Sequence, residues 1–303
     1  MRFGIDIGGT NLKFGVFSES GEVLDFYSQK FSTIIKKEEL LSSLDREVAR
    51  IVKKYDIEAG GFAIKGLVNA EKCRVVNDIA SGELLANKKI CQRFEKKFNI
   101  AIQIDNDARA YAYGEYQFGT GRNYNNMLCL TFGTGIGFAF IQNGSAFTGS
   151  DQLGGTLGGH ISIDKNGPQC DCGNYGCFEN YCSASAVAQR VQNSHPELLN
   201  GNVLPEFFDQ VRQNQDYERT LNEIIHDLAI GIVNLINAYN PEIVVLGGGL
   251  MKSSNLILPK LKPKVAEMAW SVPRGKVDLA AAQLKDKAAP KGIAFHPKLE
   301  RKL

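Results

Sequence analysis

The chain has 303 residues, more than one ordinary hydrophobic core supports, so about two domains are expected. With 35 Lys and Arg against 33 Asp and Glu, and no basic or acidic run, the sequence excludes an obvious binder of nucleic acid or membrane surfaces. No run of about 18 apolar residues exists, so no transmembrane helix is expected. The sequence is strand-like from its third residue, which argues against a signal peptide and for a cytoplasmic protein.

The predicted elements of the first half are strands that alternate with helices. The opening stretch, "RFGIDIGGTNLKFGVF", has β-branched and aromatic residues on both sides of Gly8-Gly9-Thr10, a pattern typical of a hairpin with a glycine turn. The apolar spacing then predicts a helix over 36–55, a strand over 60–66, a helix over 88–98, a strand over 100–105 that runs into Asn106-Asp107, and a helix over 108–119.

A second glycine hairpin over 127–144, "MLCLTFGTGIGFAFIQNG", repeats the pattern of the first. This weak internal repeat predicts a duplicated domain, with one α/β domain over 1–116 and another over 117–303. In the second half we expect a helix over about 180–193, a long helix over 217–240, a buried strand over 241–250 and a further helix, while the tail after Lys285 has no clear pattern.

Three strands run directly into glycines: Gly8-Gly9-Thr10, residues 133–137 ("GTGIG") and Gly247-Gly248-Gly249. Glycine allows backbone N–H groups to approach an anion closely and to adopt the positive φ angles of an anion-binding nest. Each turn taken alone is better explained as a tight hairpin, because single glycine motifs are common. Three of them, each after a strand, favour a nucleotide-binding role.

The seven cysteines divide into two sets. Cys73, Cys91, Cys129 and Cys182 are scattered, and we expect each to be a small buried hydrophobe. By contrast, Cys170, Cys172 and Cys177 are clustered, with His160 ten residues upstream. Three thiolates and one imidazole form a complete tetrahedral Zn²⁺ set with no position left for water, which predicts a structural zinc. The Cys-x-Cys spacing and a reducing compartment both disfavour a disulfide there.

Together, the stretches "DIGGTNLKFGVF", "IDNDARA", "TFGTGIG", "GGH…CDCGNYGCFE" and "VVLGGG" resemble the signature motifs of the ROK family (repressors, open reading frames and sugar kinases). The resemblance covers about residues 3–252, and its motifs occur in the family's order. It implies a two-domain actin-like, ribonuclease H-like ATPase fold with a zinc-bound loop, ATP bound across an interdomain cleft, and a sugar at the hinge.

Site residues follow from the same resemblance. The first phosphate motif would be Asp6, Gly8, Gly9, Thr10 and Lys13, the second Thr131, Gly133, Thr134 and Gly135, and the adenosine motif Gly247 and Gly248. Asp6 would help to hold Mg²⁺ through water, because Mg²⁺ retains part of its hydration shell. Asn106, His160 and Glu179 would orient the sugar, with His160 also a zinc ligand. An ordinary acid at a helix N-terminus is the alternative for Glu179.

Asp107 is the candidate catalytic base. It follows a strand end, where such groups lie beside a cleft, and a carboxylate there can accept the proton of a sugar hydroxyl. The alternative is that Asn106-Asp107 only caps the helix that begins at Ala108, and the two roles are compatible.

Several positions depart from the family pattern. Leu157 stands where a sugar-binding Glu is usual, Lys65 where Pro is common, and Arg109 where Asn is common. Losing a charged hydrogen bond costs on the order of 1.5–3 kcal/mol, so Leu157 predicts weaker or altered sugar binding.

These observations predict an ATP-dependent hexose kinase that phosphorylates a sugar hydroxyl, with the 6-OH of glucose or a related hexose as the default. An N-acetylated amino sugar or a β-glucoside are alternative substrates. A non-catalytic sugar sensor is the alternative function, although the DNA-binding module of such repressors is not present in this sequence. Sugar, ATP, Mg²⁺ and Zn²⁺ are the expected ligands, and a homodimer or homotetramer is the expected assembly.

Overall fold

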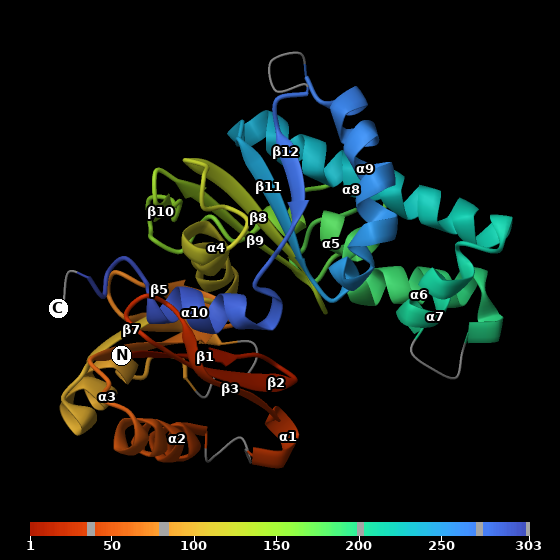
Figure 1. The fold of residues 1–303 in the computed structure, drawn as a ribbon. Helices are drawn as coiled ribbons and strands as arrows, with labels where there is room; N and C mark the ends of the chain where they lie inside the picture. Colours follow the sequence, from red (N-terminus) through yellow and green to blue (C-terminus); the bar gives the residue numbers. More distant parts are fainter. Residues whose placement is uncertain (35–39, 79–84, 199–202, 271–274, 301–303) are drawn as a thin grey trace. The chain divides into compact units, whose positions relative to one another are not determined.

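The computed structural model describes residues 1–34, 40–78, 85–198, 203–270 and 275–300 (Figure 1). The chain divides into two compact units. The first contains residues 1–123, 141–156 and 283–303, and the second contains residues 124–140 and 157–282. The expected boundary between residues 116 and 117 differs from this division, because the chain returns to the first unit twice.

A five-stranded sheet with order β3-β2-β1-β4-β7 forms the centre of the first unit. Its strands are β1 (Arg2–Ile7), β2 (Asn11–Phe17), β3 (Val23–Lys30), β4 (Ala59–Ile64) and β7 (Ala101–Asn106). The hairpin β1–β2 is antiparallel, whereas β4 is parallel to both β1 and β7. The unit also contains the short helix α1 (Phe31–Ile34) and the small hairpin β5 (Gly66–Asn69) and β6 (Arg74–Asp78).

Helices cover both faces of this sheet (Figure 1). On one face, the apolar sides of α2 (Leu40–Lys54) and α3 (Ile90–Phe98) share a core with β1, β2 and β7. On the other face, α4 (Asp107–Phe118) and α10 (Ala288–Ala294) pack together against β1 and β4. The expected helices and strands of the first half are confirmed within a few residues, except that residues 35–39 of the first helix lie outside the described residues.

The tail after Lys285, which the sequence pattern left unassigned, forms the 3₁₀ turn η5 (Lys285–Lys287) and helix α10. Every residue of α10 is buried. Its backbone lies so close to its neighbours that a Cβ at Gly4, Gly114 or Gly292 would overlap a backbone oxygen of the contacting segment. Because the helix is surrounded by protein, its sequence has no amphipathic pattern.

The second sheet has the order β10-β9-β8-β11-β12. In both sheets the first three strands form consecutive neighbours and the next two follow on the other side, so the order is the same; this supports the duplication expected from the two glycine hairpins. The strands of the second sheet are β8 (Asn126–Phe132), β9 (Ile136–Gln142), β10 (Ser145–Ala146), β11 (Ile243–Gly248) and β12 (Asp278–Ala281).

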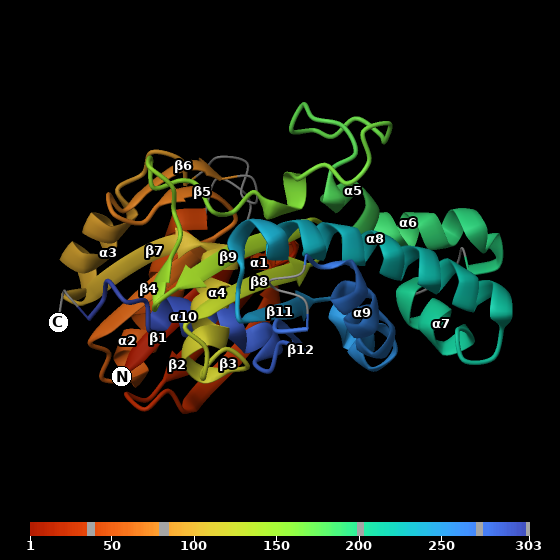
Figure 2. The ribbon, with the colours of Figure 1, turned by 90° about the horizontal axis from the view of Figure 1, so that it is seen from above.

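Helices of the second unit share one large core with β8, β9 and β11. The longest of them, α8 (Gln215–Tyr239), confirms the long helix expected from apolar spacing, and Figure 2 shows it running beside α9 and α6. The other helices are α5 (Phe178–Cys182), α6 (Ala184–Ser194), α7 (Val203–Gln210) and α9 (Ser254–Met268), with 3₁₀ turns η2 (Gly158–His160), η3 (Pro196–Leu198) and η4 (Leu250–Ser253). None of the helices in the described ranges combines the length and apolar character that a membrane span requires.

The scattered cysteines were expected to be four separate buried hydrophobes. This is confirmed for Cys129 and Cys182, which are buried free thiols. It is wrong for Cys73 and Cys91, which form a disulfide with their Cα atoms 6.2 Å apart. Their separation of 18 residues in the sequence gave no signal of the pairing, because the turn after β5 and the start of α3 meet only in the folded chain.

Candidate functional site

Candidate residues of the first unit lie at the carboxyl ends of three neighbouring parallel strands. Asp6 on β1 is in register with Ala63 on β4, which is in register with Asp105 on β7. Side chains that follow these positions therefore collect at one edge of the sheet, where ligands of open α/β sheets bind. Asp6, Lys65 and Asp107 are the charged residues at this edge, and we call Asp6, Asn106 and Asp107 the strand-end site.

Asp6 is buried, and its neighbours oppose one another. Lys13, its partner across the β1–β2 hairpin, places Nζ 3.6 Å from the Asp6 carboxylate and 3.0 Å from that of Asp286. Burial raises the pKa of Asp6 to about 6; Lys13 counteracts this rise, and the negative charge of Asp107 adds to it. Two nearby carboxylates whose ionised forms are disfavoured in this way are suited to a divalent cation, whose charge would stabilise both.

Asn106 caps helix α4, as the sequence predicted. Its Oδ1 accepts hydrogen bonds from the backbone N–H of Ala108 (2.9 Å) and Arg109 (3.2 Å). Its Nδ2 donates to the carbonyl of Gly66 and to Oδ1 of Asp107, each at 3.0 Å. The cap therefore also fixes the orientation of the Asp107 carboxylate.

Asp107 has one oxygen held in place, because Oδ1 accepts from Asn106 and from the N–H of Ala108 (3.0 Å). Burial raises the pKa of Asp107, and the Ala108 N–H and the positive charge of Lys65 limit the rise. A carboxylate oriented by hydrogen bonds, with a pKa moved towards neutrality, has the properties of a general base. The proximity of Lys65 was missed, since the sequence showed only that this position departs from the family pattern.

The glycine turns do not use glycine in the way expected. Of Gly8, Gly9, Gly133, Gly135 and Gly248, only Gly248 has a positive φ (+87°), so the expected nest geometry is wrong for the first two turns. Packing does not require glycine at Gly9 or Gly133 either, because a Cβ there would meet no atom within 4 Å; the backbone of these turns is open to a ligand. At Gly248, by contrast, a Cβ would overlap the backbone of Phe132 on the neighbouring strand.

In the second unit, the remaining phosphate and adenosine motifs lie on adjacent strands. Thr131 on β8 is in register with Gly247 on β11, and the strands are parallel. The turn after β8 and the turn after β11 therefore lie at the same edge of the second sheet. Thr134, the residue between Gly133 and Gly135, is exposed.

Glu179, in the first turn of α5, contacts the turn after β8. Its Oε2 accepts a hydrogen bond of 2.6 Å from the backbone N–H of Ile136, and a Cβ at Gly135 would lie 2.4 Å from the same oxygen. Glycine at position 135 thus makes room for this carboxylate. The contact ties Glu179 to the second phosphate motif, a connection that the sequence did not reveal.

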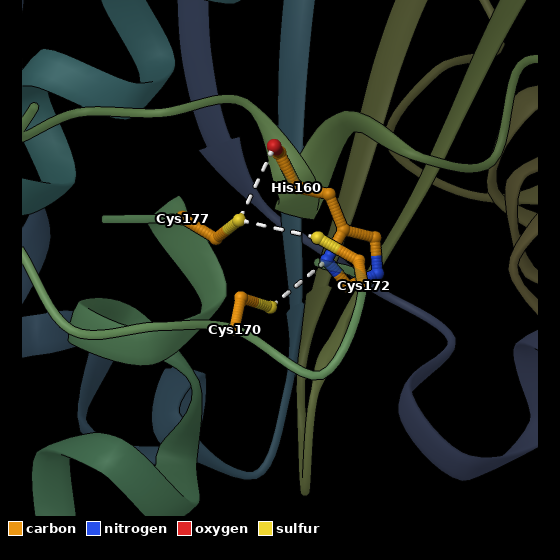
Figure 3. Close-up of side chains that lie close together, drawn as sticks. All are labelled: His160, Cys170, Cys172 and Cys177. Carbon is orange, nitrogen blue, oxygen red and sulfur yellow. Dashed lines mark hydrogen bonds between the residues drawn. The ribbon is translucent and has the colours of Figure 1, made fainter. Parts of the chain in front are cut away.

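The expected zinc ligands converge (Figure 3). One ligand atom from each of His160, Cys170, Cys172 and Cys177 lies within 4.8 Å of all the others. The distance from Cys170 Sγ to His160 Nδ1 is 3.6 Å, and that from Cys172 Sγ to Cys177 Sγ is also 3.6 Å. Two sulfurs bound to one tetrahedral Zn²⁺ with bonds of about 2.3 Å would lie about 3.7 Å apart, so the donor set fits this ion.

Only His160 Nδ1 faces the sulfurs; Nε2 points away from them (Figure 3). We call residues 160–177, which include the four ligand side chains, the Cys/His loop. The loop has no helix or long strand, but backbone hydrogen bonds shape it. Bridges join Ser162 to Cys177 and Gln169 to Tyr175, and Gly176 N–H donates to the Pro168 carbonyl (2.8 Å).

Each unit thus brings together its own predicted residues. The first unit gathers Asp6, Lys13, Asn106 and Asp107 beside the turn Gly8-Gly9-Thr10. In the second unit, Glu179 contacts the turn after β8, which contains Thr131, Gly133, Thr134 and Gly135, and Gly247 and Gly248 lie on the adjacent strand β11.

Comparison with known proteins agrees with these motifs. The sequence profile of the ROK family matches residues 2–297. A glucokinase from Thermotoga maritima is 27% identical over 303 aligned residues, which cover 96% of this chain and 95% of that protein. A xylose repressor from Bacillus subtilis is 28% identical, over 96% of this chain and 75% of the repressor.

A solved structure shows the same fold. The crystal structure of a ROK family glucokinase from Streptomyces griseus, in complex with glucose and AMPPNP, matches with a TM-score of 0.81 and 26% identity. The match covers 97% of this chain and 98% of that one. The fold is therefore the actin-like two-domain α/β fold of this group.

Proposed function

The chain belongs to the ROK family, and we propose that it is an ATP-dependent hexose kinase that phosphorylates the 6-hydroxyl of glucose or a related hexose. The observation that carries this proposal is Asp107, a buried carboxylate oriented by Asn106 at a parallel strand end, with its pKa raised. Full-length similarity to a glucokinase supports the same reaction class.

In the proposed reaction the sugar hydroxyl transfers its proton to Asp107 while its oxygen attacks the γ-phosphorus of ATP, and ADP leaves. Asn106, His160 and Glu179 would orient the sugar, His160 through the Nε2 that faces away from the cysteines. The glycine turns would hold the phosphates by backbone N–H groups, and Lys13 would neutralise part of their charge. Phosphoryl transfer requires mainly such positioning and charge neutralisation.

Two metals fit residues of the chain. Asp6 would hold Mg²⁺ through water, and Mg²⁺ supplies charge neutralisation at the phosphates. His160, Cys170, Cys172 and Cys177 would hold Zn²⁺ as a complete set of four ligands, and the bound ion would fix the loop that precedes Glu179.

Leu157 makes the sugar specificity an open part of the proposal. Its side chain is 57% exposed, and its carbonyl accepts the N–H of His160 at 2.9 Å. A leucine three residues before His160 offers no hydrogen bond to a sugar hydroxyl. We infer that the preferred sugar is either a hexose bound weakly or one with a substituent, an N-acetyl group or a glycoside, in contact with this side chain.

A second candidate, a sugar sensor without catalysis, is favoured by the similarity to the xylose repressor. A coupled assay of ADP release over a panel of hexoses, N-acetyl hexosamines and β-glucosides separates the two functions. Turnover with at least one sugar supports the kinase; sugar binding by calorimetry without turnover supports the sensor.

Asp107→Asn keeps the cap and the volume but removes the base, so kcat should fall about 10²- to 10⁴-fold with little change in sugar affinity. Asp56→Asn, an exposed acid between α2 and β4, is the matched control and should leave kcat unchanged. Wild-type kcat in the Asp107→Asn variant would refute the proposed base.

A further inference from the structure

Arg109 is the largest fully buried side chain in the described part of the chain, and its guanidinium connects three separate segments. Nε donates to Asp105 Oδ1 on β7 (2.7 Å), NH2 to the carbonyl of Val68 on β5 (2.5 Å), and NH1 to the carbonyl of Gly154 (3.1 Å). Gly154 lies in residues 147–156, which are part of the stretch 141–156 where the chain first returns to the first unit.

A buried guanidinium needs a partner charge, and Asp105 supplies it. Although burial alone would raise the pKa of Asp105, Arg109 and His296 lower it to about 2. His296 Nε2 lies 3.1 Å from Asp105 Oδ2, and the N–H of Lys298 donates to His296 Nδ1 (3.2 Å). Because Nδ1 accepts that bond, Nε2 carries the proton that is donated to Asp105. We call Arg109, Asp105 and His296 the Arg109 cluster.

Asp105 and Arg109 flank Asn106 and Asp107 in the sequence, and hydrogen bonds connect the Arg109 cluster to Asn106 by two paths. Asp105 Oδ1, the oxygen that binds Arg109, also accepts the N–H of Asn106 (2.7 Å). Arg109 holds β5 at Val68, and the same strand provides, at Gly66, the carbonyl that accepts Asn106 Nδ2. The first path ends at the backbone N–H of Asn106 and the second at its side chain, whose Nδ2 also donates to Asp107 Oδ1.

A second contact joins the same segments independently of Arg109. Asn69, at the end of β5, donates from Nδ2 to the carbonyl of Asp151 (3.3 Å), so β5 and residues 147–156 meet at two points. A lysine ammonium could pair with Asp105, but only the planar arginine guanidinium, with its several N–H donors, can also donate to two carbonyls on different segments.

We propose that Arg109 is a positioning residue for sugar phosphorylation, which holds β7, β5 and residues 147–156 in one arrangement so that Asn106 aims Asp107 at the sugar. This inference rests on the proposed kinase function. Buried ion pairs contribute little net stability compared with apolar packing, so a cluster of this kind is explained better by geometry than by stability.

The test compares Arg109→Lys and Arg109→Met with the wild type, using KM for the sugar, KM for ATP, kcat and the melting temperature. Lys retains the charge opposite Asp105 but cannot reach both carbonyls. We expect kcat/KM for the sugar to fall at least about 10-fold in both variants, because small misplacements of reacting groups cost up to about 100-fold. KM for ATP should stay within about 2-fold, and the Lys variant should melt closer to the wild type.

Arg93→Met is the matched control, since it removes a half-exposed pair with Asp45 between α3 and α2. It should lower the melting temperature slightly and leave kcat/KM unchanged. The positioning role is overturned if Arg109→Lys has the kcat/KM and the melting temperature of the wild type. It is also overturned if Arg109→Met lowers the melting temperature and leaves kcat/KM unchanged.

Should both Arg109 variants fail to fold, His296→Gln provides the decision. It disturbs Asp105 from the far side of the cluster and should raise KM for the sugar several-fold, and unchanged kinetics would overturn the proposal. A folded wild type that phosphorylates no sugar would instead refute the kinase function, and the positioning role with it. That result is distinguishable from a positioning failure, in which the wild type is active and the variants are not altered.

Discussion

The strand-end site and the Cys/His loop solve the same problem, holding chemical groups in a fixed geometry, in different ways. In the strand-end site every orienting group is supplied by the chain: Asn106 aims Asp107, and the Arg109 cluster holds Asn106. In the Cys/His loop, backbone hydrogen bonds shape an irregular stretch of chain, and one ligand atom from each of four side chains converges within 4.8 Å of the others. The groups that orient Asp107 are therefore complete within the chain, whereas the four converging donors of the Cys/His loop fit an ion, which we propose holds them together.

Metal removal should have the largest effect, and it should affect the Cys/His loop but not the strand-end site. Structural zinc sites gain on the order of 10 kcal/mol from binding, so chelation or Cys170→Ser should unfold residues 161–177. Hydrogen exchange there should accelerate by more than about 10-fold, while exchange in β7 and α4 stays unchanged. Elemental analysis of protein purified without chelator should find one Zn²⁺ per chain; a metal-free protein with a protected loop would contradict the assignment.

Asp105→Asn tests the Arg109 cluster, none of whose residues is a proposed metal ligand. The variant leaves the Arg109 guanidinium buried without its partner charge, which should lower the free energy of unfolding at pH 7 by about 3–5 kcal/mol. Because the folded pKa of Asp105, about 2, lies below its ordinary value of 3.8, the wild type should lose about 2 kcal/mol as the pH falls from about 4 to about 2.

The variant should lack that acid-dependent loss, as measured by urea unfolding at each pH. Asp45→Asn, which breaks pairs with the more exposed Arg93 and Lys97, is the control and should cost about 1 kcal/mol. Equal losses in the two variants would show that the Arg109 cluster is not special.

The pH dependence of the reaction tests whether Asp107, in the strand-end site, is the group that must be ionised. A base must be ionised, so kcat/KM should fall about tenfold per pH unit below the pKa of Asp107, which burial raises. The positive charge of Lys65 lowers that pKa, so Lys65→Met should move the acid limb to higher pH. A downward shift, or none, would show that Asp107 is not the titrating group.

Local signals were enough to predict much of this molecule. The glycine hairpins, the apolar spacing of α8 and the Asn106 cap are encoded within a few residues, and the Cys-x-Cys spacing specified the ligand set that converges. Contacts between distant segments were not predictable. His296 meets Asp105 across 191 residues of sequence, and Lys65 approaches Asp107 only because β4 and β7 pair in parallel.

The Arg109 departure was visible in the sequence, but its partners were not. Val68, Gly154 and Asp105 come from three segments, and two of the contacts use backbone carbonyls, which carry no residue-specific pattern. Positive φ angles were expected for the glycine turns because glycine permits them, whereas Gly135 is required for space beside Glu179 and Gly9 and Gly133 leave their backbone open.

Helix α10, placed among Gly4, Gly114 and the first sheet, has a consequence for synthesis on the ribosome. The first unit lacks one layer of its core until residues 288–294 have left the exit tunnel, and by then the whole second unit has been translated. The unit that begins first is thus completed last, and nascent chains halted before α10 would expose the bare face of β1 and β4 to chaperones.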